Sequence, residues 1–259
     1  MILDLRSRRL SRCMGLLLCG VLVGFQFIRA EDGAGKQPPG QSATDKKPDE
    51  KKPEEKPGDK AHQKWQSLFD EKTLAGWKET EFGGGGEVLV KDGKIVISFG
   101  EGCTGITWQK EFPKVDYEVR LQAQRVEGTD FFCGLTFPVQ DSPCSLIVGG
   151  WGGSVVGLSA IDGLLAIDNS TNKVMTFKKG QWYDIRLRVT KSRISAWIDA
   201  EQIVDFETKG HKLTIHPAVM KSQPFGICSY STTAALRKIE LRKLTEEEAA
   251  PEKPKVEPK

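Results

Sequence analysis

The sequence predicts an all-β fold for residues 65–244, in which two antiparallel sheets stack as a sandwich. Apolar and polar residues alternate with a period of two wherever a run is long enough to count, as in residues 117–124. About a dozen such short runs are separated by turns rich in Gly, Asp and Pro. No amphipathic helix lies between these runs, so the β-α-β alternation of a doubly wound fold is absent.

Residues 1–30 have the pattern of an export signal. A basic start precedes an apolar run over residues 14–28, and Ile28-Arg29-Ala30 forms a cleavage site. The pattern predicts an exported, periplasmic or extracellular protein that begins at Glu31 and keeps no transmembrane segment after cleavage. A retained anchor is the alternative, although the run is shorter than the roughly 20 apolar residues that cross a bilayer.

Residues 31–64 and 245–259 are predicted to be disordered, the first as a linker and the second as a tail. Residues 31–64 hold eight Lys, eight acidic residues and five Pro, with no large apolar side chain. Such a composition cannot bury enough apolar surface to fold. A solvated spacer is therefore expected on each side of one domain.

The net charge of +3 arises mainly in residues 1–30, since residues 65–244 carry only +1. A nucleic-acid-binding domain normally has a clustered positive face of its own. No nucleic-acid partner is therefore predicted. The oligomeric state is left open.

Two hairpins are predicted most directly from the sequence. Asp92-Gly93 separates two apolar runs, and this dipeptide accepts the positive φ angles of a two-residue turn. Residues 183–189 and 194–198 alternate around a short link and form the second hairpin. Residues 237–241 fit a strand, with a helix as the alternative. The other predicted strands are 104–108, 131–137, 146–148, 155–160, 164–167, 174–177, 203–206 and 225–230.

Four cysteines lie in the predicted domain: Cys103, Cys133, Cys144 and Cys228. Export would allow three disulfide connectivities among them. The alternative is that they are small buried apolar side chains without a bridge. Their spacing fits no zinc pattern, and His211 and His216 are five residues apart, which puts them on opposite faces of a strand.

Several segments resemble the 3-keto-disaccharide hydrolase family. The most specific is the opening motif Trp65-Gln-Ser-Leu-Phe-Asp-Glu-Lys-Thr-Leu-Ala-Gly-Trp77, and weaker matches run in order to the end of the domain. These are residues 117–121, 180–186, 196–199, 225–227 and 235–241. The resemblance implies a concanavalin A-like jelly roll, a saccharide partner and lyase or hydratase chemistry on 3-keto-glycosides.

Such chemistry needs a base that removes the proton beside the ketone and a donor or cation that stabilises the enolate. The resemblance also implies a histidine near the closing strand, but this chain has Phe225-Gly-Ile-Cys-Ser-Tyr230 there. Two functions therefore stay open: an enzyme acting on 3-keto-glycosides, and a carbohydrate-binding or envelope interaction module without catalysis.

Individual candidate residues each have a structural alternative. Trp151 is flanked by four glycines and can stack on a sugar ring, or else fill the core. Asp162 and Asp168-Asn169 bracket residues 164–167 and would bind a sugar hydroxyl or calcium, or else only form turns. Asp130 belongs to the loop acids that would supply a carboxylate pair. The weak catalytic candidates are Asp130, Asp162 and Asp168, and the substrate-binding candidates are Trp151 and Asn169.

Overall fold

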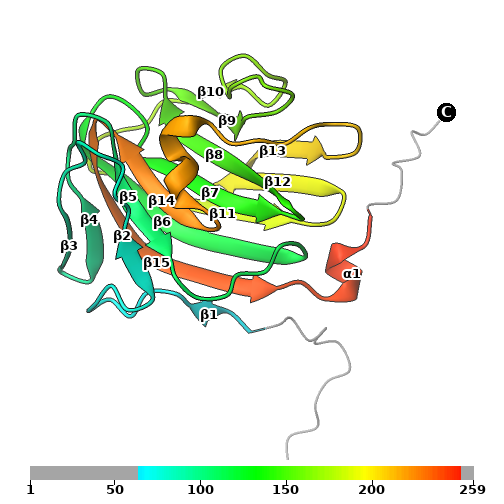
Figure 1. Cartoon of the computed structure of the whole chain (residues 1–259), viewed down its shortest axis with the longest axis horizontal. Coiled ribbons are helices and arrows are strands. Elements are labelled where there is room, and N and C mark those ends of the chain that lie inside the picture. Colours follow the sequence, from blue (N-terminus) through cyan, green and yellow to red (C-terminus); the bar gives the residue numbers. More distant parts are fainter. Residues whose placement is uncertain (1–63, 252–259) are drawn as a thin grey trace, which may run out of the picture. The chain divides into compact units, whose positions relative to one another are not determined.

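The computed structural model describes residues 64–251, which form two antiparallel sheets packed face to face (Figure 1). This arrangement confirms the predicted two-sheet sandwich. The predicted signal, almost all of the linker and the last eight residues of the predicted tail lie outside the described residues. Within residues 64–251, no helix has the length and apolar character needed to cross a membrane.

The first sheet has the strand order β13-β12-β11-β6-β15-β4-β3, and the short β1 pairs with β15 beside this path. Its central strands are β6 and β15, the two longest strands among the described residues, which run antiparallel to each other. The strands are β1 (Gln66–Ser67), β3 (Val88–Lys91), β4 (Lys94–Ile97), β6 (Tyr117–Gly128), β11 (Trp182–Val189), β12 (Arg193–Ile198), β13 (Glu201–Glu207) and β15 (Thr232–Lys243).

The second sheet has the order β10-β9-β8-β7-β14-β5-β2, again with antiparallel neighbours. A short 3₁₀ helix, η1 (Pro217–Ser222), precedes its strand β14 and contacts β14 and β5. The strands are β2 (Trp77–Glu79), β5 (Cys103–Trp108), β7 (Cys133–Val139), β8 (Ser142–Gly150), β9 (Val155–Ser159), β10 (Lys173–Val174) and β14 (Gly226–Tyr230).

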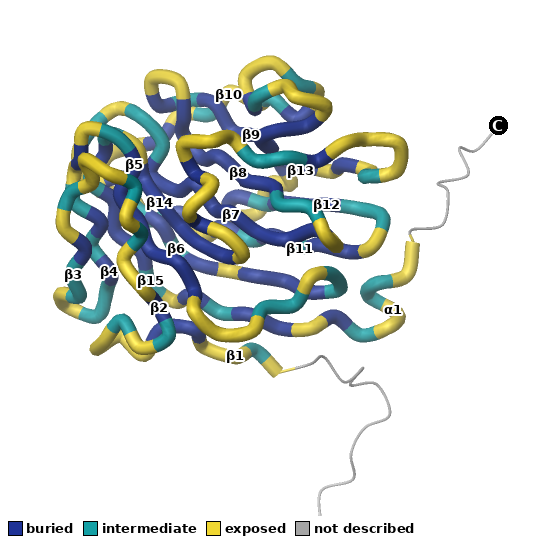
Figure 2. Tube along the Cα trace, in the orientation of Figure 1, coloured by how far each residue is buried: buried dark blue, intermediate teal, exposed yellow. Residues whose placement is uncertain are grey.

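The core lies between the two sheets and follows from the alternation of side chains along the strands. Tyr117, Val119 and Leu121 of β6 point inward, and all three are buried. Buried segments of both sheets face one another in Figure 2. The hydroxyl of Tyr117 donates to the carbonyl of Pro138 at 2.7 Å, so its polar atom is satisfied inside the core.

The turn between β3 and β4 shows why the Asp-Gly dipeptide predicts a hairpin. Asp92 has φ 51° and Gly93 has φ 71°, so both central residues adopt the left-handed conformation. A two-residue turn of this kind matches the twist of the paired strands. The second predicted hairpin is also present as β11 and β12.

Residues 164–167 do not form the predicted strand but lie in turns, and Leu164 makes only an isolated bridge to Ile161. Of the predicted strand 174–177, only Val174 lies in a strand, as the second residue of β10 (Lys173–Val174). Both segments are apolar, but they are too short for the periodicity of their side chains to distinguish a strand from a turn.

The alternative helix over residues 237–241 is absent, because this segment belongs to β15. A register shift between Arg237 and Glu240, with Lys238 at φ 52°, interrupts the alternation there. A bulge of this kind shifts the side chains that follow to the other face, which makes a strand resemble a helix in sequence.

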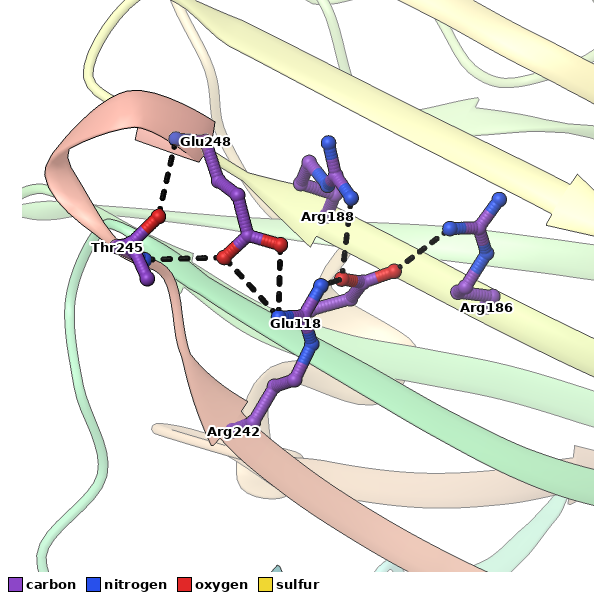
Figure 3. Close-up of polar contacts among 6 residues, drawn as sticks. All are labelled: Glu118, Arg186, Arg188, Arg242, Thr245 and Glu248. Atoms are coloured by element: carbon purple, nitrogen blue, oxygen red, sulfur yellow. Dashed lines mark hydrogen bonds and ion pairs between the residues drawn. The ribbon is translucent and has the colours of Figure 1, made fainter. Parts of the chain in front are cut away.

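The predicted disordered tail starts too early, because the helix α1 (Glu246–Ala249) follows β15. Thr245 caps this helix, and its side chain and that of Glu248 hydrogen-bond to each other's backbone N–H groups. Glu248 also binds the guanidinium of Arg242, which in turn binds the buried carboxylate of Glu118 (Figure 3). This chain of contacts holds α1 on the first sheet.

Candidate functional site

An open pocket of about 360 Å³ lies on the outer face of the second sheet. The alternation along β8 sends Leu146 and Val148 into the core and Ser145 and Ile147 into this pocket. The segment around Leu165 forms another part of the wall, and η1 closes a further side. The residues with aromatic or chemically active side chains are Cys103, Asp130, Phe131, Trp151, His216 and Tyr230.

Two aromatic side chains pack together on one wall of the pocket. The rings of Phe131 and Tyr230 are stacked, with 5.8 Å between their centroids. Phe131 lies against the sheet at Gly134, where a Cβ atom would be only 2.9 Å from the ring. A glycine is therefore required at this position of β7 for Phe131 to lie flat.

Trp151 stands on the loop between β8 and β9 and is 38% exposed, so it does not fill the core. The loop turns sharply, since Trp151 has φ 48° and its neighbour Gly152 has φ 82°. The glycines that flank Trp151 in sequence thus allow the backbone to make a tight loop that points outward. This places the side chain of Trp151 on the wall of the pocket.

The buried side chain of Arg125 fixes that loop. Its Nη2 atom donates to the carbonyl oxygens of Asp130 at 3.2 Å, Gly149 at 3.1 Å and Gly153 at 2.9 Å. The guanidinium also lies over the ring of Phe132, 5.1 Å from the centroid. Burial lowers the pKa of Arg125. Arg125 therefore connects the end of β6 in one sheet to two loops of the other sheet.

Asp130 joins the same two loops through its carboxylate. One oxygen accepts the backbone N–H of Phe131 at 2.8 Å, and the other accepts that of Gly152 at 3.4 Å. Asp130 and Trp151, two of the residues predicted as site candidates, therefore line the same pocket.

His216 faces the pocket from the residue that precedes η1. Its Nδ1 atom accepts the backbone N–H of Ala218 at 3.2 Å, so the neutral ring carries its proton on Nε2. An imidazole in this tautomer acts as a hydrogen-bond donor toward a ligand.

The pocket lining includes the thiol of Cys103, and the buried Cys228 packs beside it. This neighbour lowers the pKa of the Cys103 thiol, while the Cys228 thiol donates to the carbonyl of Gly134 at 3.6 Å. Cys133 and Cys144 belong to the core, where burial raises the pKa of each to about 12. All four cysteines are free, so none of the three disulfide connectivities is present.

Asp162, Asp168 and Asn169 lie outside the pocket. Asp162 accepts the backbone N–H of Lys212 at 2.7 Å and pairs with Nδ1 of His211 at 2.7 Å, and the bond to His211 is the main cause of its lowered pKa. Asp168 is exposed in a turn. These two acids therefore do not share the edge of a strand, because residues 164–167 form none.

Asn169 is hydrogen-bonded inside its own loop, and its role in substrate binding stays a prediction. Its amide nitrogen donates to the carbonyls of Leu158 and Leu165, and its oxygen accepts both polar hydrogens of Thr171. Within residues 64–251, no three His, Cys, Asp or Glu side chains are grouped so as to hold a metal ion. The calcium site considered for Asp162 and Asp168 has no counterpart there.

Sequence reasoning did not select Cys103, His216 or Tyr230. The alternation within residues 225–230 places Cys228 and Tyr230 on the face opposite the core, so the sequence pattern could have indicated that Tyr230 lies on the outer face of the sheet. His216 lies in a segment without periodicity, and only the packing of η1 on β5 and β14 brings it to the pocket.

Comparisons with known proteins agree with this fold. A family model described as a 3-keto-alpha-glucoside-1,2-lyase-like domain matches residues 64–242. No curated protein matches the chain. Among solved structures, a Bacillus subtilis protein of unknown function with a galectin-like fold has 12% identity and a TM-score of 0.51, and the match covers 71% of this chain and 96% of that one.

Two further solved structures are similar over a comparable length. A putative glycosyl hydrolase from Parabacteroides distasonis has 14% identity and a TM-score of 0.45, with 70% of this chain and 94% of that chain covered. A carbohydrate binding module from Bacillus subtilis has 12% identity and a TM-score of 0.43, with 65% and 96% covered. The fold is the antiparallel, concanavalin A-like jelly roll that the sequence predicts.

Proposed function

Because this chain belongs to the family of 3-keto-alpha-glucoside-1,2-lyase-like domains, we propose that its open pocket binds a saccharide of the 3-keto-glycoside class. One observation carries this proposal: an outward-pointing tryptophan, a carboxylate and an imidazole donor share a single pocket.

The chemistry of the pocket suits a sugar ring. Trp151 presents an exposed aromatic surface on which the C–H face of a pyranose can stack. Asp130 accepts hydrogen bonds from hydroxyl groups, while Nε2–H of His216 donates one. A ketone oxygen is the acceptor that would use the His216 donor best, because that bond strengthens when the oxygen becomes an enolate.

We also propose that the domain functions after export, in the periplasm or outside the cell. The support is the basic and apolar pattern of residues 1–30. Mass determination of the mature protein would test it, since cleavage predicts an N-terminus at Glu31. A retained Met1 would contradict cleavage, and recovery of the protein from the cytoplasmic fraction would contradict export.

Replacing Trp151 by alanine is expected to weaken saccharide binding by about 2 kcal/mol, roughly 30-fold in Kd, because a buried aromatic anchor contributes this much in many interfaces. The measurement is calorimetric titration with a panel of glucosides and a nitrophenyl 3-keto-glucoside. Free energies of unfolding, measured in parallel, show whether the variant stays folded.

Phe99→Ala is the matched control, because Phe99 is also an exposed aromatic residue but does not line the pocket. It should leave the Kd unchanged. Equal Kd values for Trp151→Ala and the wild type would exclude the pocket as the binding site. Absence of binding to any saccharide of the panel would contradict the proposed function itself.

A further inference from the structure

One side of the pocket is apolar around the stacked pair of Phe131 and Tyr230, whose side chain is 39% exposed. Phe131 packs against a small buried cluster that contains Cys103 and Val219, and both of these residues also line the pocket. We call the four side chains the aromatic wall. Its polar side-chain atoms are the hydroxyl of Tyr230 and the sulfur of Cys103, and sulfur is a weak hydrogen-bond partner.

Backbone contacts fix the aromatic wall in place. The carbonyl of Phe131 accepts the N–H of Tyr230 at 3.0 Å, and the N–H of Phe131 donates to the carboxylate of Asp130 at 2.8 Å. Tyr230 is also the partner of Cys103 in the register of β14 and β5. An aromatic surface that is fixed before binding loses little conformational entropy when a ligand stacks on it.

The polar side chains that suit a sugar ring lie mainly on the other side of the pocket. The carboxylate of Asp130 accepts the N–H of Gly152, beside Trp151 on the loop between β8 and β9. Ser145 of β8 and Ser159 of β9 are partners in the strand register, and both line the pocket. A pyranose stacked on Trp151 therefore lies over β8 and β9, where its hydroxyl groups find these partners.

The strand order separates the two sides of the pocket. β7 lies between β8 and β14, so Tyr230 of β14 and Cys103 of β5 belong to the part of the pocket beyond β7. Two steps between neighbouring strands cover roughly 10 Å. A sugar ring over β8 therefore leaves the aromatic wall free for the group bound at C1 of that sugar, the aglycone.

We propose that the aromatic wall binds the aglycone and selects glycosides whose aglycone is an aromatic ring over those whose aglycone is a second sugar. The proposal rests on the saccharide-binding function proposed above. An aryl group stacks on Tyr230 and buries its own apolar area there. A second sugar would bring several hydroxyl groups against a wall with one good hydrogen-bond partner, and each hydroxyl that leaves water without a partner weakens binding.

Titration of the full-length protein with phenyl, methyl and glucosyl 3-keto-glucosides tests this selection, because these ligands differ only in the aglycone. The Kd, or KM where the ligand is turned over, should be roughly tenfold lower for the phenyl than for the methyl compound. The glucosyl compound should bind no more tightly than the methyl compound.

Equal values for the phenyl and methyl compounds, or tightest binding of the glucosyl compound, would overturn the aglycone subsite and leave saccharide binding standing. Absence of binding by all three would remove the proposed function itself, and the subsite with it. This comparison uses the wild-type protein, so its outcome does not depend on the folding of any variant.

Variants show whether the selection comes from the aromatic wall. Tyr230→Ala should raise the Kd of the phenyl compound to about that of the methyl compound and leave the methyl compound unchanged. Tyr230→Phe keeps the ring and should keep the selection. Trp151→Ala should weaken both ligands by the same factor, because it removes the surface on which the sugar stacks.

Free energies of unfolding, measured for each variant, show whether it stays folded. An equal loss for the phenyl and methyl compounds in a folded Tyr230→Ala variant would show that Tyr230 only shapes the pocket. That result would contradict the assignment of the aromatic wall to the aglycone.

Discussion

Replacing Glu118 by alanine is expected to lower the free energy of unfolding by about 3–5 kcal/mol, the cost of removing one partner from a buried ion pair. Glu118 is 1% exposed and accepts hydrogen bonds from Arg186 at 2.9 Å, Arg188 at 3.2 Å and Arg242 (Figure 3). Without the carboxylate, three guanidinium groups would face one another over the centre of the first sheet. Arg242 also holds Glu248, so α1 should lose part of its anchorage.

Urea unfolding followed by tryptophan fluorescence measures this cost. Glu240→Ala is the control, because Glu240 pairs with Arg120 at 2.6 Å but its side chain is 25% exposed. An ion pair that water reaches contributes about 0–1 kcal/mol, so this variant should be nearly as stable as the wild type. A similar loss in both variants would mean that the burial of Glu118 does not decide its contribution.

The sandwich could be predicted because its strands carry a local signal. Residues 117–123 and 183–189 alternate strictly, and β6 and β11 contain them with the expected side chains inside. The failures have local causes too. The bulge near Lys238 interrupts the alternation of β15. Residues 164–167 are apolar but lie in turns, so the loop conformation determines which of their side chains are buried. Such outcomes depend on tertiary packing, which a short window cannot show.

The candidate site was only partly predictable, because its residues come from distant parts of the chain. The glycines around Trp151 indicated an unusual loop, and the structure places that loop at the pocket. The pairing of Cys103 with Tyr230, in contrast, depends on which strands become neighbours. The hydrogen bonds that occupy Asn169 also depend on a loop conformation that its sequence does not reveal.

Replacing Arg125 by methionine is expected to lower the free energy of unfolding by about 3 kcal/mol and to weaken saccharide binding roughly tenfold. Methionine keeps an apolar stem beside Phe132 but removes the donor that three carbonyl oxygens share, and each buried acceptor left unpaired costs about 1–3 kcal/mol. Gly149 and Gly153 flank Trp151, so the loop that presents its ring should lose its fixed position. A binding group that must be ordered on contact contributes less affinity.

Arg237→Met distinguishes this effect from the general loss of an arginine stacked on an aromatic ring. Arg237 lies 4.1 Å from the ring centroid of Trp182 and donates to Gln122, but it is on the outer face of the first sheet and touches no part of the pocket. Its replacement should cost less than about 1 kcal/mol and leave the Kd unchanged, since a partly exposed cation–π contact is weak. If Arg125→Met unfolds more easily yet binds saccharide as tightly as the wild type, the position of Trp151 is determined by the glycines of its loop and by Asp130, and not by the guanidinium beneath it.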